Sequence, residues 1–353
     1  MIRFLLSIFD DHGADLRRKT VALYTLLVVA NGVVWLWAWL ALHGQPVLFG
    51  SAMLAYTLGL RHAVDADHIA AIDNVTRKLV REGRRPITAG FFFSLGHSSV
   101  VTLMSVAVAV ATVALQSHFD ALKNIGSVVG TSVSAFYLFL LGGFNLVVLV
   151  SVWRTFHAVR RGAALHDGEL DLLLNQRGLL ARLFQPLFRL TSRSWHMYPM
   201  GFLFGLGFDT ATEVALFGIA AAEAGKGLSF WSIMVFPALF TAGMSLVDTA
   251  DSTLMQGAYG WAATKPLRKL LYNFTVTLVS VLVALGVAGI ETLGLLRERF
   301  HLAGEAWDLV GRLNDNFGLL GYGIIGLFVV CWLVSLALYK LKRYDELDAT
   351  LVR

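Results

Sequence analysis

The sequence predicts an all-α integral membrane protein with eight transmembrane helices. Of the 353 residues, 56% are hydrophobic and only 15% are charged, whereas a soluble globular chain carries about 25% charged residues. Apolar runs recur along the whole chain, and each is long enough to cross a bilayer as a helix. Lysine and arginine gather in alternate connecting segments, as they do in a multi-pass membrane protein.

The expected spans form one membrane domain over residues 1–353. In chain order they are 21–42, 47–75, 87–115, 126–153, 197–222, 230–257, 268–290 and 318–341. Four prolines precede or open a span, where a missing N–H costs nothing: Pro46, Pro86, Pro199 and Pro266. The longest connection, 154–196, is basic and partly apolar, so we expect short helices there at the cytoplasmic membrane surface.

The distribution of basic residues predicts the orientation. The two termini and the 2–3, 4–5 and 6–7 connections hold 23 of the 29 Lys and Arg residues, the other connections hold 5, and Arg61 lies inside a span. This places both termini in the cytoplasm and the chain in the cytoplasmic (inner) membrane. The net charge of +5 is therefore explained by topology, and no nucleic-acid partner is expected. The single cysteine, Cys331, excludes an internal disulfide and a thiolate metal cluster.

Two short matches indicate an inverted repeat of spans 1–3 and 4–6. Residues 58–61 (LGLR) resemble 206–209 (LGFD), and residues 93–98 (FSLGHS) resemble 240–245 (FTAGMS). The two glycines concerned lie 37 residues apart in the first half and 36 in the second. Such repeats are typical of secondary transporters, whose substrate site lies at the repeat interface.

Span 2 carries the densest group of ionisable side chains. Each charged group at a helix centre costs about 2.5–3.5 kcal/mol on insertion scales, so each one suggests a function. On an ideal helix His62, Asp65 and His68 fall within an arc of about 120°, and two imidazoles with a carboxylate suit a divalent transition metal. Asp67 points elsewhere on that helix. It either pairs with Arg61 or another helix, or joins the site through a distorted span.

Other spans add candidates for the site and the transport path. His97 in span 3 is interpreted either as a metal ligand or as a hydrogen-bonded packing group. Asp209 and Glu213 in span 5 share a helix face because they are four residues apart. The further candidates on the transport path are Val64, whose size could tune the metal cavity, Thr210, Met244, which is more typical of plain packing, Asp248 and Asp251.

These groups are expected at similar depths in the bilayer. Counted from the cytoplasmic ends at 1.5 Å per residue, one set lies roughly 15–18 Å deep: His62, His97, Asp209 and Asp248. Two more groups lie about 9–10 Å deep: His68 and Asp251. Polar groups from four helices thus converge on one band, between the bilayer midplane and the cytoplasm.

Four segments resemble the nickel/cobalt transporter (NiCoT) family, in particular its bacterial high-affinity nickel permeases. They are 61–69 (RHAVDADHI), 93–99 (FSLGHSS), 206–213 (LGFDTATE) and 243–252 (GMSLVDTADS), and the resemblance covers nearly the whole chain. It implies eight helices and inward transport of Ni²⁺ and, in some members, Co²⁺. It also implies essential roles for His62, Asp67 and His68, and the emphasis on Asp67 favours a distorted span 2.

Other classes of function fit less well. An embedded zinc protease needs a His-Glu-x-x-His segment, which is absent, and a desaturase-like enzyme needs several histidine-rich boxes. A channel is disfavoured because imidazole and carboxylate ligands bind transition metals too firmly for fast conduction. A metal-efflux permease remains the alternative. We expect no enzyme activity and no cofactor, with the metal ion as substrate; the driving force is either the membrane potential or a proton gradient.

Overall fold

The structure is a computed structural model that describes most of the chain. The described residues are 10–11, 15–111, 128, 131–143, 145–147, 149–150, 153, 191–206, 213, 216–217, 219–220, 228–262 and 266–341. All regular elements within these ranges are helices. The predicted spans 126–153 and 197–222 are only partly covered. Asp209, Thr210 and most of the 154–196 connection lie outside the described residues.

Within the described ranges, four helical segments are long and apolar enough to cross a membrane by themselves. They are Leu16–Leu42 (α2), Ala89–Ala107 within α5 (Ala89–Ala111), Phe230–Gly260 across α11 (Phe230–Ile233) and α12 (Val235–Ala262), and Thr277–Phe300 within α13 (Pro266–Phe300). The number rises to six when two bent helix pairs are each counted as one span. The helix α2 buries only 17% of its most apolar window, so most of its surface is free to face lipid.

Span 2 is not the single helix that the sequence predicts. It consists of α3 (Pro46–His62) and α4 (Ala66–Arg81), which meet at an angle of 51°. The chain leaves the helix at 63–65, and Asp65 takes an extended conformation (φ −64°, ψ 147°) at the N-terminus of α4. The prediction that Arg77 and Lys78 belong to the 2–3 connection is also wrong. Both lie within α4, where they are 1% and 5% exposed.

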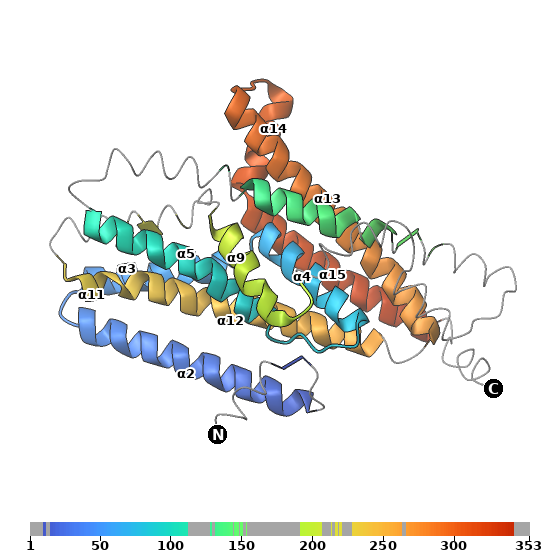
Figure 1. Cartoon of the computed structure of the whole chain (residues 1–353), viewed down its shortest axis with the longest axis horizontal. Coiled ribbons are helices and arrows are strands. Elements are labelled where there is room, and N and C mark those ends of the chain that lie inside the picture. Colours follow the sequence, from blue (N-terminus) through green and yellow to red (C-terminus); the bar gives the residue numbers. More distant parts are fainter. Residues whose placement is uncertain are drawn as a thin grey trace, which may run out of the picture.

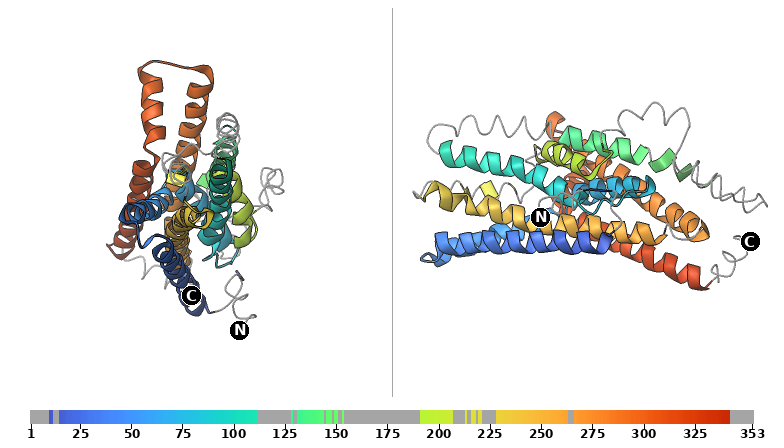
Figure 2. Two further views of the ribbon diagram at one scale, coloured as in Figure 1. Left: turned by 90° about the vertical axis from the view of Figure 1, so that its left-hand side faces the viewer. Right: turned by 60° about the horizontal axis from the view of Figure 1, so that its bottom comes forward.

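The C-terminal third contains a helix that the sequence analysis did not predict. The helix α13 continues ten residues past its predicted end at 290, and α14 (Glu305–Asp315) follows before α15 (Phe317–Leu341). Arg297 donates to Asp308 Oδ1 at 3.3 Å, which joins α13 to α14. This hairpin projects from the rest of the bundle (Figure 1, Figure 2).

Several helices meet at glycines with almost no space between their backbones, among them the α3–α12 pair and the pair of α5 with α9 (Met197–Gly205). In the α3–α12 pair, a Cβ added to Gly59 of α3 would lie 2.1 Å from the Phe240 carbonyl oxygen of α12. A Cβ added to Gly243 of α12 would likewise clash with the backbone of α3. In the second pair, α5 packs on α9, and a Cβ on Gly96 or Gly201 would lie 1.9 or 2.0 Å from the facing backbone. Small residues are what permit such close approach between membrane helices.

The helix α12 organises the site because it packs against α2, α3, α4 and α5 (Figure 1). The short helix α4 is enclosed by α12, α13 and α15. The break in span 2 therefore lies inside the bundle, at the junction of α3, α4, α5 and α12. One apolar cluster lies on each side of this junction, around Ile72 and around Phe240.

Candidate metal site

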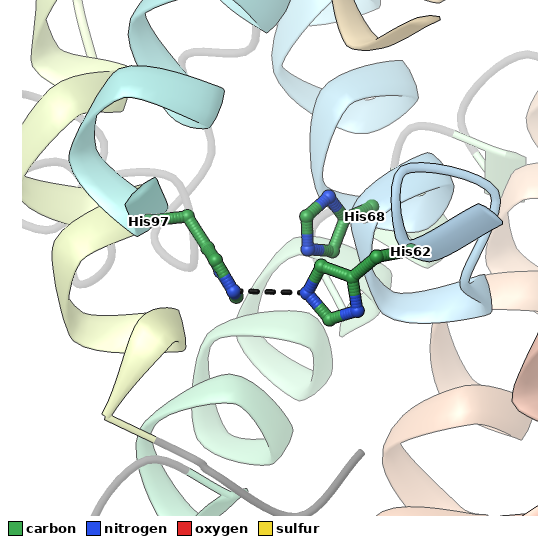
Figure 3. A group of neighbouring side chains, drawn as sticks. All are labelled: His62, His68 and His97. Carbon is green, nitrogen blue, oxygen red and sulfur yellow. Dashed lines mark hydrogen bonds between the residues drawn. The ribbon is translucent and has the colours of Figure 1, made fainter. Parts of the chain in front are cut away.

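Three histidines from three helices meet at the break in span 2. His62 is the last residue of α3, His68 lies in the first turn of α4, and His97 lies in the middle of α5. One ring nitrogen from each lies within 4.8 Å of the others, and the side chains are all buried (Figure 3). The ring atoms Nε2 of His62 and His97 are 2.9 Å apart. We call these three residues the histidine site.

The break brings the rings of His62 and His68 into contact. In a continuous helix they would be separated by about 9 Å along the axis, which is why the sequence predicted different depths for them. At the break, α4 departs from the direction of α3 by 51°, and the two rings lie 4.7 Å apart, centroid to centroid. The break also turns the C-terminal, negative end of the α3 dipole toward the site, where it favours a cation.

In both span 2 histidines, the ring atom Nδ1 faces a carboxylate oxygen. Asp65 Oδ2 lies 3.1 Å from His62 Nδ1, and its other oxygen lies 3.6 Å from Arg61 Nη1. Asp248, fully buried on α12, places Oδ1 3.4 Å from His68 Nδ1. Carboxylates in this position fix the ring orientation and raise the basicity of the remaining nitrogen. Arg61 therefore pairs with Asp65 and not with Asp67.

The carboxylate next to His97 is that of Glu213, whose Oε1 lies 2.9 Å from His97 Nε2. Glu213 is 1% exposed. The sequence analysis named Glu213 for sharing a face with Asp209 and did not predict this contact. Within the described part of the chain, His68 Nε2 and His97 Nδ1 are buried without a hydrogen-bond partner. The site thus offers buried ring nitrogens to a metal ion.

The other predicted residues take different positions. Asp67 is partly buried at the first turn of α4, outside the group of three converging histidines, and interacts electrostatically with His62 and His68. Val64 lies in the break and belongs to an apolar cluster. Met244 is fully buried in the other apolar cluster, as expected of a packing residue.

A second buried polar cluster escaped the sequence analysis. Asp73 on α4 is fully buried, and its carboxylate accepts hydrogen bonds from Tyr259 on α12, Ser280 on α13 and Arg77 on its own helix. Its signal in the sequence was an Asp and an Arg four residues apart near the end of an apolar run. That spacing was obscured because Arg77 was assigned to the following connection.

Buried imidazoles and carboxylates inside a bundle of membrane-length helices define a multi-pass membrane protein with a site suited to a transition-metal ion. Residues 48–338 match the family described as "High-affinity nickel-transport protein" (NicO), and the chain belongs to this family. The resemblance inferred from the four motifs is therefore confirmed.

Curated relatives align over almost their full lengths. A "High-affinity nickel transport protein" of Cupriavidus necator is 60% identical over 98% of this chain and 99% of its own. The "Hydrogenase nickel incorporation protein HupN" of Bradyrhizobium diazoefficiens is 49% identical over 96% and 90%. The "Cobalt transport protein NhlF" of Rhodococcus rhodochrous is 40% identical over 92% and 94%. No solved structure matches the chain.

Proposed function

We propose that this protein carries Ni²⁺, and Co²⁺ as a second substrate, into the cell across the cytoplasmic membrane by secondary transport. The observation that carries the proposal is the convergence of His62, His68 and His97, whose ring nitrogens lie within 4.8 Å of one another in a buried position. Intramembrane ionisable groups at a repeat interface are typical of substrate sites in secondary transporters. Asp65, Asp248 and Glu213 orient the rings, and Asp67 adds negative charge.

The spacing of the nitrogens favours an ion with right angles between its ligands, such as Ni²⁺, over a tetrahedral ion such as Zn²⁺. Imidazole nitrogens bind such metals at about 2.0–2.1 Å. When the ion binds, His97 Nε2 exchanges its contact with Glu213 Oε1 for the metal. The two Nε2 atoms of His62 and His97, 2.9 Å apart, would then subtend about 90° at the shared ion, whereas tetrahedral ligands at the same bond length lie about 3.4 Å apart. Right angles between ligands are typical of square-planar and octahedral sites, and Ni²⁺ favours the tetragonal arrangement.

The proposed architecture has eight helices, both termini in the cytoplasm and an inverted repeat of helices 1–3 and 4–6. Two glycine crossings support the repeat. The α3–α12 pair joins spans 2 and 6, and the α5–α9 pair joins spans 3 and 5. A two-fold axis that exchanges span 2 with 5 and span 3 with 6 would exchange these two crossings. The asymmetric distribution of Lys and Arg supports the orientation.

The names of the relatives support the choice of substrate. Nickel transport is named for the Cupriavidus protein and cobalt transport for the Rhodococcus protein. We rank Ni²⁺ first because the relative with 60% identity carries the nickel name. The alternative, efflux of the same ions, differs in direction and not in ligand chemistry.

The test is uptake of radioactive nickel by cells that express the chain, with excess cobalt, zinc or manganese as competitors. We expect accumulation at low external Ni²⁺, strong competition by Co²⁺ and weak competition by Mn²⁺. A His62→Gln/His68→Gln double variant of equal abundance provides the baseline. Accumulation no higher than that baseline would overturn the proposal, and accumulation below the empty-vector level would favour efflux.

A further inference from the structure

The second buried polar cluster consists of Asp73 and the residues that donate hydrogen bonds to it, and we call it the Asp73 cluster. Asp73 is fully buried, and donors from three helices converge on its carboxylate: the Tyr259 hydroxyl, the Ser280 hydroxyl at 2.7 Å and Arg77 Nη2 at 3.1 Å. Donors that converge in this way hold a carboxylate in one position.

Arg77 is bound much less completely than its partner. Its side chain is 1% exposed. Over the described ranges, its Nε and Nη1 have no hydrogen-bond partner although both atoms are buried. Its guanidinium carbon lies 5.6 Å from the centre of the Tyr259 ring, within range of a cation–π contact. Buried arginines usually satisfy their donors, since unmatched ones are costly. The guanidinium is thus a buried positive charge whose recorded contacts among the described residues are one ion pair with Asp73 and the Tyr259 ring.

A row of carboxylates connects this cluster to the histidine site. Asp248 is fully buried and uses Oδ1 on His68, while its Oδ2 is buried without a partner among the described residues. Asp251 lies one turn further along α12 and has a buried Oδ2 that likewise lacks a hydrogen-bond partner in the described part of the chain. Asp251 interacts electrostatically with both Asp248 and Asp73. A buried carboxylate oxygen without a donor is costly unless a cation or a donor satisfies it.

We propose that Asp251 and Asp73 form a second cation-binding site on the cytoplasmic side of the histidine site, and that Arg77 neutralises it while no ion is present. We call these two carboxylates the exit site. The proposal rests on the transport function and orientation proposed above. It assigns a part in release of the metal to Asp73, Arg77 and Tyr259. The sequence analysis gave none of these residues a role.

The chemistry explains why such a site is useful. The histidine site binds a transition metal through nitrogen, and a firm site releases its ion slowly. Oxygen ligands bind Ni²⁺ less firmly than imidazoles do, because imidazole suits nickel and carboxylate suits harder ions. An ion that moves to Asp251 and Asp73 repels Arg77 toward the Tyr259 ring. When Arg77 returns to Asp73, it displaces the ion toward the cytoplasm.

The competing explanation is a purely structural ion pair between Asp73 and Arg77. The two explanations differ in what happens when Arg77 loses its charge. A structural pair leaves Asp73 as an uncompensated buried charge, which lowers stability and creates no binding. An exit site instead binds a metal ion in place of the arginine.

The experiment counts bound metal by equilibrium dialysis of purified, detergent-solubilised full-length chain against radioactive Ni²⁺. We expect one ion per wild-type chain, two per Arg77→Gln chain and one again in Arg77→Gln/Asp73→Asn. The matched control is Arg81→Gln, which removes an arginine one turn further along α4 whose Nη2 donates to Asn145. This control should bind one ion.

The outcomes separate the two proposals. A wild-type chain that binds no nickel would overturn the histidine site itself. One ion in both the wild type and a folded Arg77→Gln chain, or two ions retained in the double variant, would overturn the exit site alone. Asp251→Asn gives an independent measurement. Its expected result is unchanged binding of one ion and unchanged melting temperature, with uptake reduced at least tenfold. Wild-type uptake by this variant would also overturn the exit site.

Discussion

His62 Nε2 lies 2.9 Å from His97 Nε2, although the residues are 35 positions apart and belong to different helices. Two ring nitrogens at this distance either share one proton or bind one ion. The first arrangement would hold the empty site together, and in the proposed metal-bound state the ion would replace the proton. The same pair of atoms can therefore stabilise the bundle before the metal arrives and coordinate the ion afterwards.

Replacement of His62 or His68 with Gln should abolish nickel uptake. Glutamine keeps some hydrogen bonding, so the helices should still assemble, but it lacks the strong nitrogen ligand. Titration calorimetry on the purified His62→Gln/His68→Gln chain should detect no nickel binding. His43→Gln, at an exposed position after α2, should behave as wild type. Wild-type-like binding by the double variant would locate the metal elsewhere, and the carboxylates of α12 would be tested next.

Glu213 should act through His97. Its Oε1 lies 2.9 Å from the ring, and loss of a carboxylate that orients a metal-binding histidine typically costs about 10–100-fold in affinity or activity. Glu213→Ala should therefore raise the apparent KM for nickel by about that factor. Glu213→Gln, which keeps an acceptor, should lose less. Equal uptake by both variants and the wild type would show that Glu213 does not orient the ring.

Gly321 should be indispensable for the break in span 2. A Cβ at this position of α15 would lie 1.6 Å from the Val64 carbonyl oxygen, in the turn between α3 and α4. Gly321→Ala must push α15 away from that turn, and overpacking of this kind costs about 1–3 kcal/mol. We expect a lower melting temperature and a large loss of uptake. Gly323→Ala is the control on the same helix, because a Cβ there meets nothing within 4 Å.

The residues of the site could be predicted from the sequence, but their arrangement could not. His62, His68 and His97 were recognisable because ionisable groups are costly in apolar runs. The local signal for the break in span 2 was weak. Asp65 is a preferred residue type at a helix N-cap, but residues 63–65 (AVD) contain neither proline nor glycine. The break depends on tertiary contacts, such as the close approach of Gly321 to Val64. The placement of His62 and His68 on one face of an ideal helix therefore assumed a continuous helix, which the structure does not contain.

Asp248 should contribute to nickel uptake through its negative charge more than through helix packing. It is fully buried and places Oδ1 3.4 Å from His68 Nδ1. Asn at this position keeps an oxygen that accepts from the ring, so the orientation of His68 should survive in Asp248→Asn. The negative charge is lost, and a neutral group cannot offset the charge of a metal ion in a low-dielectric site. We therefore expect normal protein abundance with uptake near the empty-vector level.

A residue that only joined α12 to α4 would behave differently. Its Asn variant would lose abundance and uptake in parallel, so both are measured on the same membranes, by immunoblot and by radioactive nickel. Asp308→Asn is the matched control, since that carboxylate lies in an exposed ion pair between α13 and α14 and should be dispensable. Uptake by Asp248→Asn in proportion to its abundance would assign Asp248 to packing. Its charge would then have no part in binding the ion beside His68.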